Sequence, residues 1–311
     1  MSEPNSSFNT SSSKYTIIFM VILSFVCALI LSILASALRE PQEVAKEIDR
    51  STQMLIAARI MSPYGYFQVQ EGEDKFSPAK IEKGGNLVST EEFIIPSRDD
   101  ILEVYHKRIQ AFLVNDKGEE TTFEKVGLKE EKYVSEYRKT GYYRQLQKLI
   151  YKIYPNKKAE NSKDENESIE GYVIPINGMG LWDAIYGYLA IKPDGDTVIG
   201  ISWYDQKETP GLGANITEAD WQSQFPGKVI FQEGATGTTN FQTAPIGITV
   251  VKGKVKEVLG DSPKAKSAVD GMAGATLTGN GVTNAYKDVL SAYRPFLISM
   301  HDKIAKETPK K

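Results

Sequence analysis

The stretch GYVIPINGMGLWDAIYGYLAIKPDGDTVIGISW, residues 171–203, decides the fold class of this chain. Three runs within it, Tyr172–Ile176, Ile185–Ile191 and Thr197–Trp203, are rich in β-branched and aromatic residues, a composition typical of strands. Between the last two runs, Pro193–Asp196 (PDGD) supplies the residue types that favour a tight turn. The stretch therefore predicts short strands, the last two joined as a hairpin.

The sequence beyond this stretch adds strands and helices in a mixed order. Ile246–Val251 predicts one more strand, and helical patterns lie at Glu218–Phe225 and Val282–Tyr293. In the second helical pattern, the apolar residues fall on one stripe at helical spacing. Because strands and helices follow one another without a regular alternation, the pattern favours an α+β fold.

An apolar run near the N-terminus has the length of a membrane span. From Tyr15 to Leu38 there is no charged residue, and Lys14 and Arg39 bracket the run. As a helix it would be about 36 Å long, enough to cross a hydrocarbon core of about 30 Å. Residues 35–37 (ASA) resemble a signal-peptide cleavage site, but the run exceeds the roughly 7 to 15 apolar residues of a signal peptide. We therefore expect an uncleaved transmembrane helix over 15–38, preceded by a tail over 1–14.

The charges beside this run leave its orientation open. One lysine precedes it, whereas Arg39, Lys46 and Arg50 follow it, which by the positive-inside rule favours a cytoplasmic C-terminal portion. Acidic residues lie among these basic ones, and long domains are translocated largely regardless of such charges.

Residues 39–170 carry much charge and give weaker structural signals. Pro41 is a favourable first helical residue and opens an expected helix over 41–61, and Glu92–Ile95 is a candidate short strand. An amphipathic pattern predicts a helix near Tyr143–Tyr154, and the polar run Asn156–Ser168 predicts a solvated loop. This loop is expected to separate a membrane-proximal portion from the portion that contains the motifs.

Composition excludes several classes of protein. The formal net charge is -3 and the pI is about 5.7, so nucleic acid is not an expected partner. Cys27, the only cysteine, lies inside the apolar run, which excludes a disulfide, a thiolate zinc site or an iron–sulfur cluster in the rest of the chain. His106 and His301 are widely separated, so we expect neither a metal site nor a histidine catalyst.

The segment Asp270–Gly279 (DGMAGATLTG) is the most informative about function. Its glycines and alanines leave the backbone uncrowded, and Thr276 and Thr278 place hydroxyls just before the expected last helix. Unpaired N–H groups at such a position favour an anion such as a phosphate. An ordinary threonine N-cap after a glycine turn would give the same pattern, and the Lys-Ser/Thr ending of a nucleoside-triphosphate loop is missing.

Two further clusters contain residues suited to a ligand. Glu208–Gly213 (ETPGLG) is an expected tight turn that presents Thr209 and Leu212 on a loop. Gly178–Trp182 (GMGLW) places a large aromatic residue directly before a strand. Taken one at a time, these clusters also fit a plain turn and a core tryptophan.

Taken together and in order, these motifs resemble a known family. The chain is similar to the FMN-binding domain of the C subunit of the sodium-translocating NADH:quinone reductase in Tyr172–Trp182, Tyr186–Ala190, Glu208–Gly213, Val250–Gly253 and Asp270–Thr278. The G subunit of the related electron-transport complex shares the ETPGLG and Gly-Ala-Thr elements. The resemblance covers the anchor, the helix after it and residues 171–295, and matches residues 62–170 loosely.

This resemblance implies a covalently bound cofactor. FMN would be joined through its phosphate to the hydroxyl of Thr276 as a phosphoester, installed from FAD by a flavin transferase, with Gly274 and Ala275 in the attachment loop. The residues implied to contact the flavin are Trp182, Glu208, Thr209 and Leu212 around the isoalloxazine and Lys252 near its polar edge or phosphate. Family members usually carry Ser or Thr where Ala273 stands, so one local hydrogen bond is not expected here.

The implied function is that of an electron-transfer subunit, which relays electrons from NADH toward quinone in a sodium-pumping complex with other membrane subunits as partners. No Gly-x-Gly-x-x-Gly follows a strand and opens a helix, so we expect no NADH site and no stand-alone activity. The resemblance places the protein in the bacterial inner membrane with its FMN-binding domain on the extracytoplasmic side. The implied divisions are a membrane-proximal helical and charged region over 39–170, the FMN-binding domain over 171–295 and a C-terminal tail over 296–311.

Three alternatives remain open from the sequence. The G subunit of a ferredoxin-linked complex carries the same flavin-attachment motifs. A membrane-tethered binding or scaffold domain without flavin would satisfy each motif taken singly. A self-standing flavin reductase would oxidise NADH without partners.

Overall fold

The structure, a computed structural model, describes residues 13–72, 75–156, 169–234 and 239–307. The chain divides into two compact units, Met1–Asp49 and Arg50–Lys311. The expected N-terminal tail over 1–14 and the expected loop Asn156–Ser168 lie almost entirely outside the described residues.

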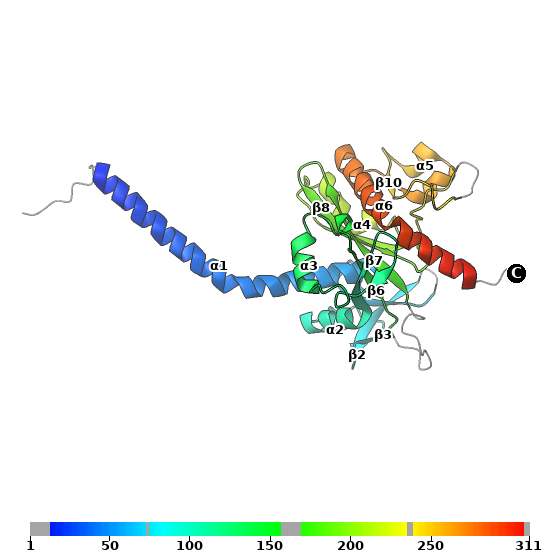
Figure 1. The fold of residues 1–311 in the computed structure, drawn as a ribbon, viewed down its shortest axis with the longest axis horizontal. Helices are drawn as coiled ribbons and strands as arrows, with labels where there is room; N and C mark the ends of the chain where they lie inside the picture. Colours follow the sequence, from blue (N-terminus) through cyan, green and yellow to red (C-terminus); the bar gives the residue numbers. More distant parts are fainter. Residues whose placement is uncertain (1–12, 73–74, 157–168, 235–238, 308–311) are drawn as a thin grey trace, which may run out of the picture. The chain divides into compact units, whose positions relative to one another are not determined.

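Helix α1, Ser13–Ala57, runs without interruption through Pro41 (Figure 1). Within the described residues, its part Ser13–Arg39 is long and apolar enough to cross a membrane. The helix expected over 41–61 is confirmed over 41–57, but Pro41 does not open it, because Pro41 lies inside a longer helix. A proline in a helix removes one backbone hydrogen bond, and here the helix continues on both sides of it.

The C-terminal end of α1 is a left-handed turn. Arg59 has a φ of 56°, and Ile60 N donates to Leu55 O at 2.9 Å while Arg59 N donates to Ile56 O at 2.9 Å. These two bonds form a Schellman motif, which usually uses glycine at the left-handed position. The Arg59 guanidinium lies 4.0 Å from the centroid of the Phe76 ring, a contact that holds this turn against the strand Phe76–Glu82.

A small antiparallel sheet and a helix come next in the chain. The sheet contains β1 (Phe67–Gln70), β2 (Phe76–Glu82) and β3 (Asn86–Ser89) in that order. Helix α2, Arg98–Arg108, begins at a capping box in which Ser97 and Asp100 satisfy each other's backbone N–H groups. The strand expected at Glu92–Ile95 is wrong, because these residues are irregular and exposed. Pro96 follows directly and has no N–H to continue a ladder.

The main sheet is antiparallel and has six strands, in the order β5-β4-β6-β7-β8-β9. The strands are β4 (Ile109–Val114), β5 (Glu120–Thr121), β6 (Lys148–Ile153), β7 (Gly171–Met179), β8 (Ala184–Ile191) and β9 (Val198–Asp205). The three predicted strand runs and the hairpin turn at 193–196 are confirmed by β7, β8 and β9. The sheet also continues across residue 170, since Tyr151 pairs with Val173 and Ile153 with Gly171.

The helix predicted near Tyr143–Tyr154 is wrong. A short 3₁₀ turn, Tyr142–Arg144, is followed there by β6, in which all six side chains are buried. Lys148 and Lys152 interrupt the apolar pattern, but they pair with Asp116 and Glu120 and bury their aliphatic stems. A strand buried on both faces loses the strict alternation that identifies a strand, so its pattern resembled an amphipathic helix.

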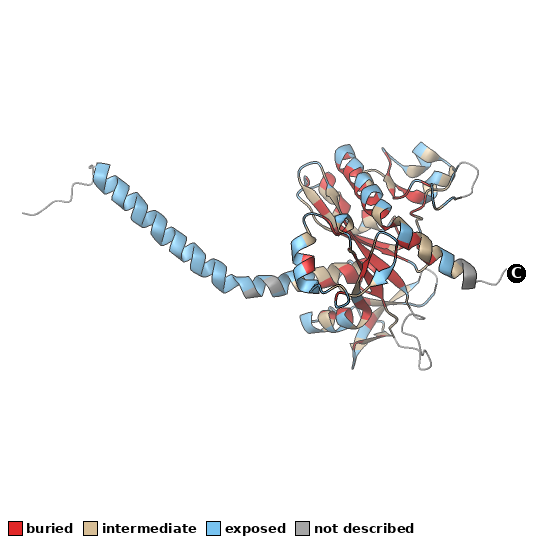
Figure 2. Cartoon of the chain, in the orientation of Figure 1, coloured by how far each residue is buried: buried red, intermediate tan, exposed pale blue. Residues whose placement is uncertain are grey.

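Alternate residues of the sheet face two separate apolar cores. From β7, Ile174 and Ile176 join a core with α6 and the loops that follow β9, whereas Val173 joins a core with the end of α1 and α2. Figure 2 shows buried residues concentrated in the sheet and along α6. This sandwich of helix, sheet and helix is the expected α+β fold.

Helix α6, Thr276–Glu307, packs on β7 (Figure 1). The approach is close, because a Cβ added at Gly178 would lie 2.6 Å from Ala285 Cβ, and one added at Gly281 would overlap Met179 O. The predicted helix Val282–Tyr293 is confirmed and is longer at both ends. The expected tail over 296–311 is wrong in its first part, because Phe296, Leu297 and Met300 are buried on α6.

Shorter elements complete the fold. They are α3 (Glu130–Tyr137), α4 (Ala219–Gln222), α5 (Val255–Leu259), the parallel pair β10 (Thr249–Val250) and β11 (Ala268–Val269), and 3₁₀ turns at Gly213–Thr217 and Pro263–Ser267. Helix α4 confirms the helical pattern expected at Glu218–Phe225. The strand expected at Ile246–Val251 is reduced to β10, with Ile246 forming an isolated bridge to Phe231.

Candidate functional site

Three segments that are distant in the sequence meet at one end of the main sheet. They are the turn 180–182 between β7 and β8, the loop 208–213 after β9, and residues 274–278 at the start of α6. Each carries one of the motifs noted in the sequence. The sheet fixes the first two and the packing of α6 on β7 fixes the third, so rigid elements hold the site.

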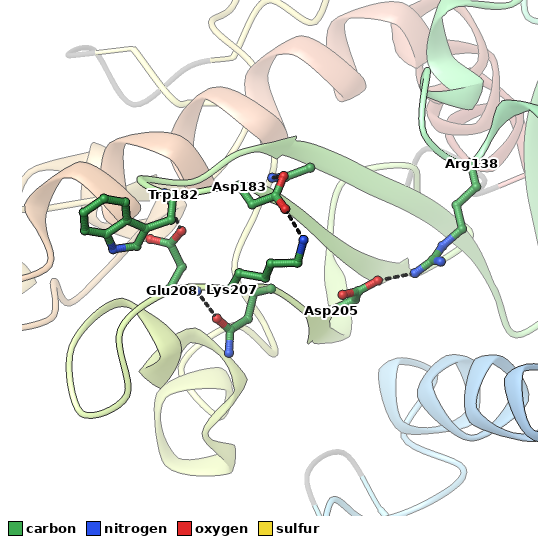
Figure 3. Close-up of polar contacts among 8 residues, drawn as sticks. Arg138, Trp182, Asp183, Asp205, Lys207 and Glu208 are labelled. Atoms are coloured by element: carbon green, nitrogen blue, oxygen red, sulfur yellow. Dashed lines mark hydrogen bonds and ion pairs between the residues drawn. The ribbon is translucent and has the colours of Figure 1, made fainter. Parts of the chain in front are cut away.

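Glu208 joins the three segments. Its Oε1 accepts hydrogen bonds from Leu181 N and Trp182 N, both at 3.0 Å, and its Oε2 accepts one from the hydroxyl of Thr278. Figure 3 shows Glu208 directly below Trp182. The side chain is 5% exposed and that of Thr278 is 1% exposed. Glu208 therefore acts as an internal connection rather than as a group directed into open solvent.

Hydrogen bonding keeps this carboxylate charged. Burial raises the pKa of Glu208, but hydrogen bonds donated by Thr278 and by the backbone N–H groups of residues 181–183 outweigh burial, and the pKa lies below its ordinary value. Because the charged form is the hydrogen-bonded one, Glu208 contributes stability above the ordinary glutamate pKa of about 4.3. That contribution is lost as the pH falls through the lower, folded-state pKa.

Two glycines allow the segments to approach this carboxylate. A Cβ added at Gly180 would lie 2.5 Å from Glu208 Oε1, and one added at Gly213 would lie 2.9 Å from Glu208 Oε2 and overlap the Thr278 hydroxyl. A side chain at either position would separate the segments. These glycines therefore belong to the site, although they would carry no chemistry themselves.

The start of α6 leaves hydrogen-bond donors available. The first intrahelical bond there runs from Gly279 N to Ala275 O at 2.9 Å, so the N–H groups of residues 276–278 have no partner four residues earlier within the helix. Ala275 occupies the N-cap position, where alanine has no side-chain oxygen to accept from these groups. Thr276, the first helical residue, is exposed. The helix end thus offers unpaired donors beside an exposed hydroxyl.

Gly274 brings the segment before α6 against Leu212. Its φ is +70°, and a Cβ added there would lie 2.9 Å from Leu212 Cδ2. A residue with a side chain would therefore meet both a strained backbone and a steric contact.

We expect Gly274→Ala to destabilise the full-length chain by about 1–2 kcal/mol from the left-handed backbone alone, with a further cost from the contact with Leu212. Denaturant unfolding in detergent measures this change. Gly227→Ala is the matched control, because Gly227 has a φ of +79° and nothing within 4 Å of an added Cβ. An equal loss of unfolding free energy in the two variants would show that Leu212 does not constrain Gly274.

A cleft of about 180 Å³ lies between the three segments. Its lining residues are Leu181, Glu208, Thr209, Leu212, Gly213, Gly274, Ala275, Thr276, Leu277 and Thr278. Six of the eight sequence-predicted site residues are brought together here. The seventh, Trp182, lies at the edge, 67% exposed, and its indole Nε1 donates to Thr209 Oγ1 at 3.1 Å.

The eighth predicted residue, Lys252, lies in a second cleft of about 470 Å³. This cleft shares Gly274, Ala275 and Thr276 with the first, and Lys254, Glu257 and Asn280 are among its other residues. Lys254 Nζ pairs with Asp270 Oδ2 at 3.0 Å. Thr276 therefore stands between an apolar cleft that contains three leucines and a cleft that contains two lysines.

Several cleft residues were not singled out from the sequence. Leu181, Gly213, Leu277, Lys254 and Asn280 line the two clefts, and Thr278 was noted only as a hydroxyl. Leu181 and Leu277 each adjoin a predicted site residue, which is the one signal that could have identified them. Within the described ranges, no three His, Cys, Asp or Glu side chains gather as a metal-ligand set.

The fold and the site define the class of protein. The FMN-binding domain family matches residues 180–291, a range that contains all three segments of the first cleft. Among solved structures, the C subunit of the Na(+)-translocating NADH-quinone reductase from Parabacteroides distasonis is similar with a TM-score of 0.52 and 24% identity, covering 84% of this chain and 96% of that one. The chain thus has the fold of an FMN-binding domain protein.

Curated relatives identify the family more closely. The C subunit of the Na(+)-translocating NADH-quinone reductase of Chlamydia pneumoniae is 42% identical over 294 residues, which cover 92% of this chain and 91% of the relative. The corresponding protein of Haemophilus ducreyi is 31% identical over 280 residues, 90% of each chain. The chain therefore belongs to the family of the C subunit of the Na(+)-translocating NADH-quinone reductase.

Proposed function

We propose that this chain carries FMN covalently on Thr276, as a phosphoester with the threonine hydroxyl, and serves as an electron-transfer subunit of the reductase complex. The observation that carries this proposal is the position of Thr276. Its side chain is exposed at the uncapped start of α6, at the place where the two clefts meet. Thr278, two residues later, is buried and bonded to Glu208, so it is not available for attachment.

The residues present fit such a group. A phosphate at Thr276 would lie at the N-terminus of α6, where unpaired N–H groups and the helix dipole stabilise an anion. Leu181, Leu212 and Leu277 provide apolar surface in the first cleft for a flat ring. Lys252 places a positive charge in the adjoining cleft, which shares residues 274–276 with the first and so favours an anionic group there.

Attachment from FAD would exchange a phosphoanhydride bond for a phosphoester bond. The Thr276 hydroxyl forms the new O–P bond, the pyrophosphate P–O bond of FAD breaks, AMP leaves, and the hydroxyl proton goes to a base on the flavin transferase. The uncrowded residues 273–275 leave room for a second protein to reach the hydroxyl. Ala273 is exposed and has no hydroxyl to compete with Thr276.

Bound FMN would supply reversible two-electron and one-electron chemistry. Residues of this chain hold the group, exclude part of the solvent from it and set the charge around it. We propose that electrons pass from NADH toward quinone, with the other membrane subunits as donors and acceptors.

The membrane side of the unit Arg50–Lys311 is also part of this proposal. We place it outside the cytoplasm, because covalent attachment retains a cofactor where a free one would diffuse away. Protease added to intact cells should then cleave this unit, and protection until lysis would contradict the placement.

Peptide mass mapping tests the attachment. The full-length chain, coexpressed with a flavin transferase, should give one proteolytic peptide containing Thr276 whose mass is increased by FMN less one water. Fluorescence of the denatured chain in a gel gives an independent readout. A chain without covalent flavin under these conditions would favour a membrane-tethered binding domain instead.

A further inference from the structure

Glu208 has a property that contact with a flavin would not require. A residue that lines a flavin ring needs only an apolar contact surface. Glu208 instead places a carboxylate in the wall of the cleft, and both of its oxygens accept hydrogen bonds from other groups of this chain. We propose that the negative charge of Glu208, held in the wall of the cleft, lowers the reduction potential of the flavin held at Thr276. This inference rests on the proposed function and assigns Glu208 a role through its electric field.

The geometry makes the charge part of the cleft wall. Glu208 accepts from Leu181 N and Trp182 N on one side and from the Thr278 hydroxyl on the other. Its own N–H donates to Gln206 Oε1 at 2.5 Å, which fixes the backbone at the start of the loop. The carboxylate therefore cannot rotate away without breaking hydrogen bonds in two other segments.

The donors to this carboxylate are neutral. In the described part of the chain, backbone N–H groups and one hydroxyl make the hydrogen bonds to Glu208, and such donors stabilise the charge without cancelling it. The lysine one residue earlier does not neutralise it, because Lys207 Nζ pairs with Asp183 Oδ2 at 2.5 Å (Figure 3). A net negative charge therefore remains beside the first cleft.

That charge opposes reduction of a flavin in the cleft. Reduction adds negative charge to the ring, and a fixed anion in the wall of the cleft raises the free energy of the reduced form. Hydrogen bonds hold the pKa of Glu208 below its ordinary value, so the charge is present throughout the neutral range. The same donors that position the carboxylate also limit the field that reaches the ring.

Redox titration of the covalently bound flavin tests the inference at neutral pH, on the full-length chain coexpressed with a flavin transferase. Glu208→Gln should raise the midpoint potential by about 30 mV or more, a tenfold change in the equilibrium constant for two-electron reduction. Asp220→Asn is the matched control, because Asp220 is an exposed carboxylate on α4 whose charge is screened by solvent. It should leave the potential unchanged.

Variants of Thr278 give a second test that does not depend on how well Glu208→Gln folds. Thr278→Val removes one donor and leaves the charge less compensated, so the potential should fall. Thr278→Ser keeps the hydroxyl and should retain the wild-type potential.

Four outcomes would decide against the inference or its premise. A wild-type potential in Glu208→Gln, or an equal shift in Asp220→Asn, would overturn it. If Glu208→Gln carries no flavin, equal potentials in Thr278→Val and Thr278→Ser would do the same. Absence of covalent flavin from the wild-type chain would instead contradict the proposed function itself.

Discussion

Replacing Thr276 with valine should abolish covalent flavin. Valine has nearly the shape of threonine but lacks the hydroxyl, so the O–P bond cannot form, and the flavin fluorescence of the denatured chain should fall to background. Because Thr276 is exposed and its side chain is not needed for packing, the stability of the fold should change by less than about 0.5 kcal/mol. In-gel fluorescence and denaturant unfolding measure the two quantities separately.

Thr276→Ser is the matched control, because it keeps a hydroxyl at the first position of α6. It should retain covalent flavin. Undiminished flavin in Thr276→Val would mean attachment elsewhere. The other hydroxyl of the loop, on Thr278, is 1% exposed, so such a result would also require the helix start to rearrange.

The second large effect concerns stability. Phe296→Ala should destabilise the chain by about 3–5 kcal/mol, because it removes a large buried side chain and leaves a cavity. Phe296 is 1% exposed and meets Tyr172 of β7 edge to face, with ring centroids 5.3 Å apart. Denaturant unfolding followed by tryptophan fluorescence measures the change in the full-length chain.

Asp302→Ala, on the exposed face of the same helix, is the control for Phe296→Ala. It should change the free energy of unfolding by no more than about 0.5 kcal/mol. A small effect of Phe296→Ala would instead mean that residues after 295 are the tail that the sequence suggested.

Helices could be predicted from the sequence where the apolar periodicity is regular. The residues at which they begin and end could not. The stripe through Val282 and Val289 located α6, but Gly279, Gly281 and Pro295 resemble helix breakers at its two ends. Tertiary packing explains why a glycine occurs inside the helix. At position 281 a glycine is needed because Met179 O lies where a side chain would be. Such a requirement depends on a strand about 100 residues earlier in the chain, so local pattern cannot reveal it.

The strands show the same limit. The runs of β7, β8 and β9 were recognisable from their composition and from the turn between the last two. The strand β6 was missed because the partners of its buried Lys152 are distant in the sequence. Lys152 pairs with Glu120 and contacts the Phe112 ring. Without knowledge of those partners, a lysine inside an apolar run indicates an exposed face.

For the site, the motifs located the residues but not their relations. Leu212, Gly274 and Thr276 lie together as the motifs implied. The sequence did not reveal that Lys252 lines a separate cleft, nor that Glu208 is directed into the protein. A carboxylate that accepts hydrogen bonds from two other segments has the same sequence signature as one that faces a ligand.

The pairing of β6 with β7 limits how the portion that begins at Gly171 can be transferred between proteins in evolution. A chain shortened to begin at Gly171 would lose β4, β5 and β6, and the backbone of residues 171–173 would become an open border of the sheet. An exposed edge strand has unpaired backbone N–H and C=O groups, which pair with other chains and promote aggregation. Gene fusion or domain shuffling should therefore transfer this portion only together with β4, β5 and β6.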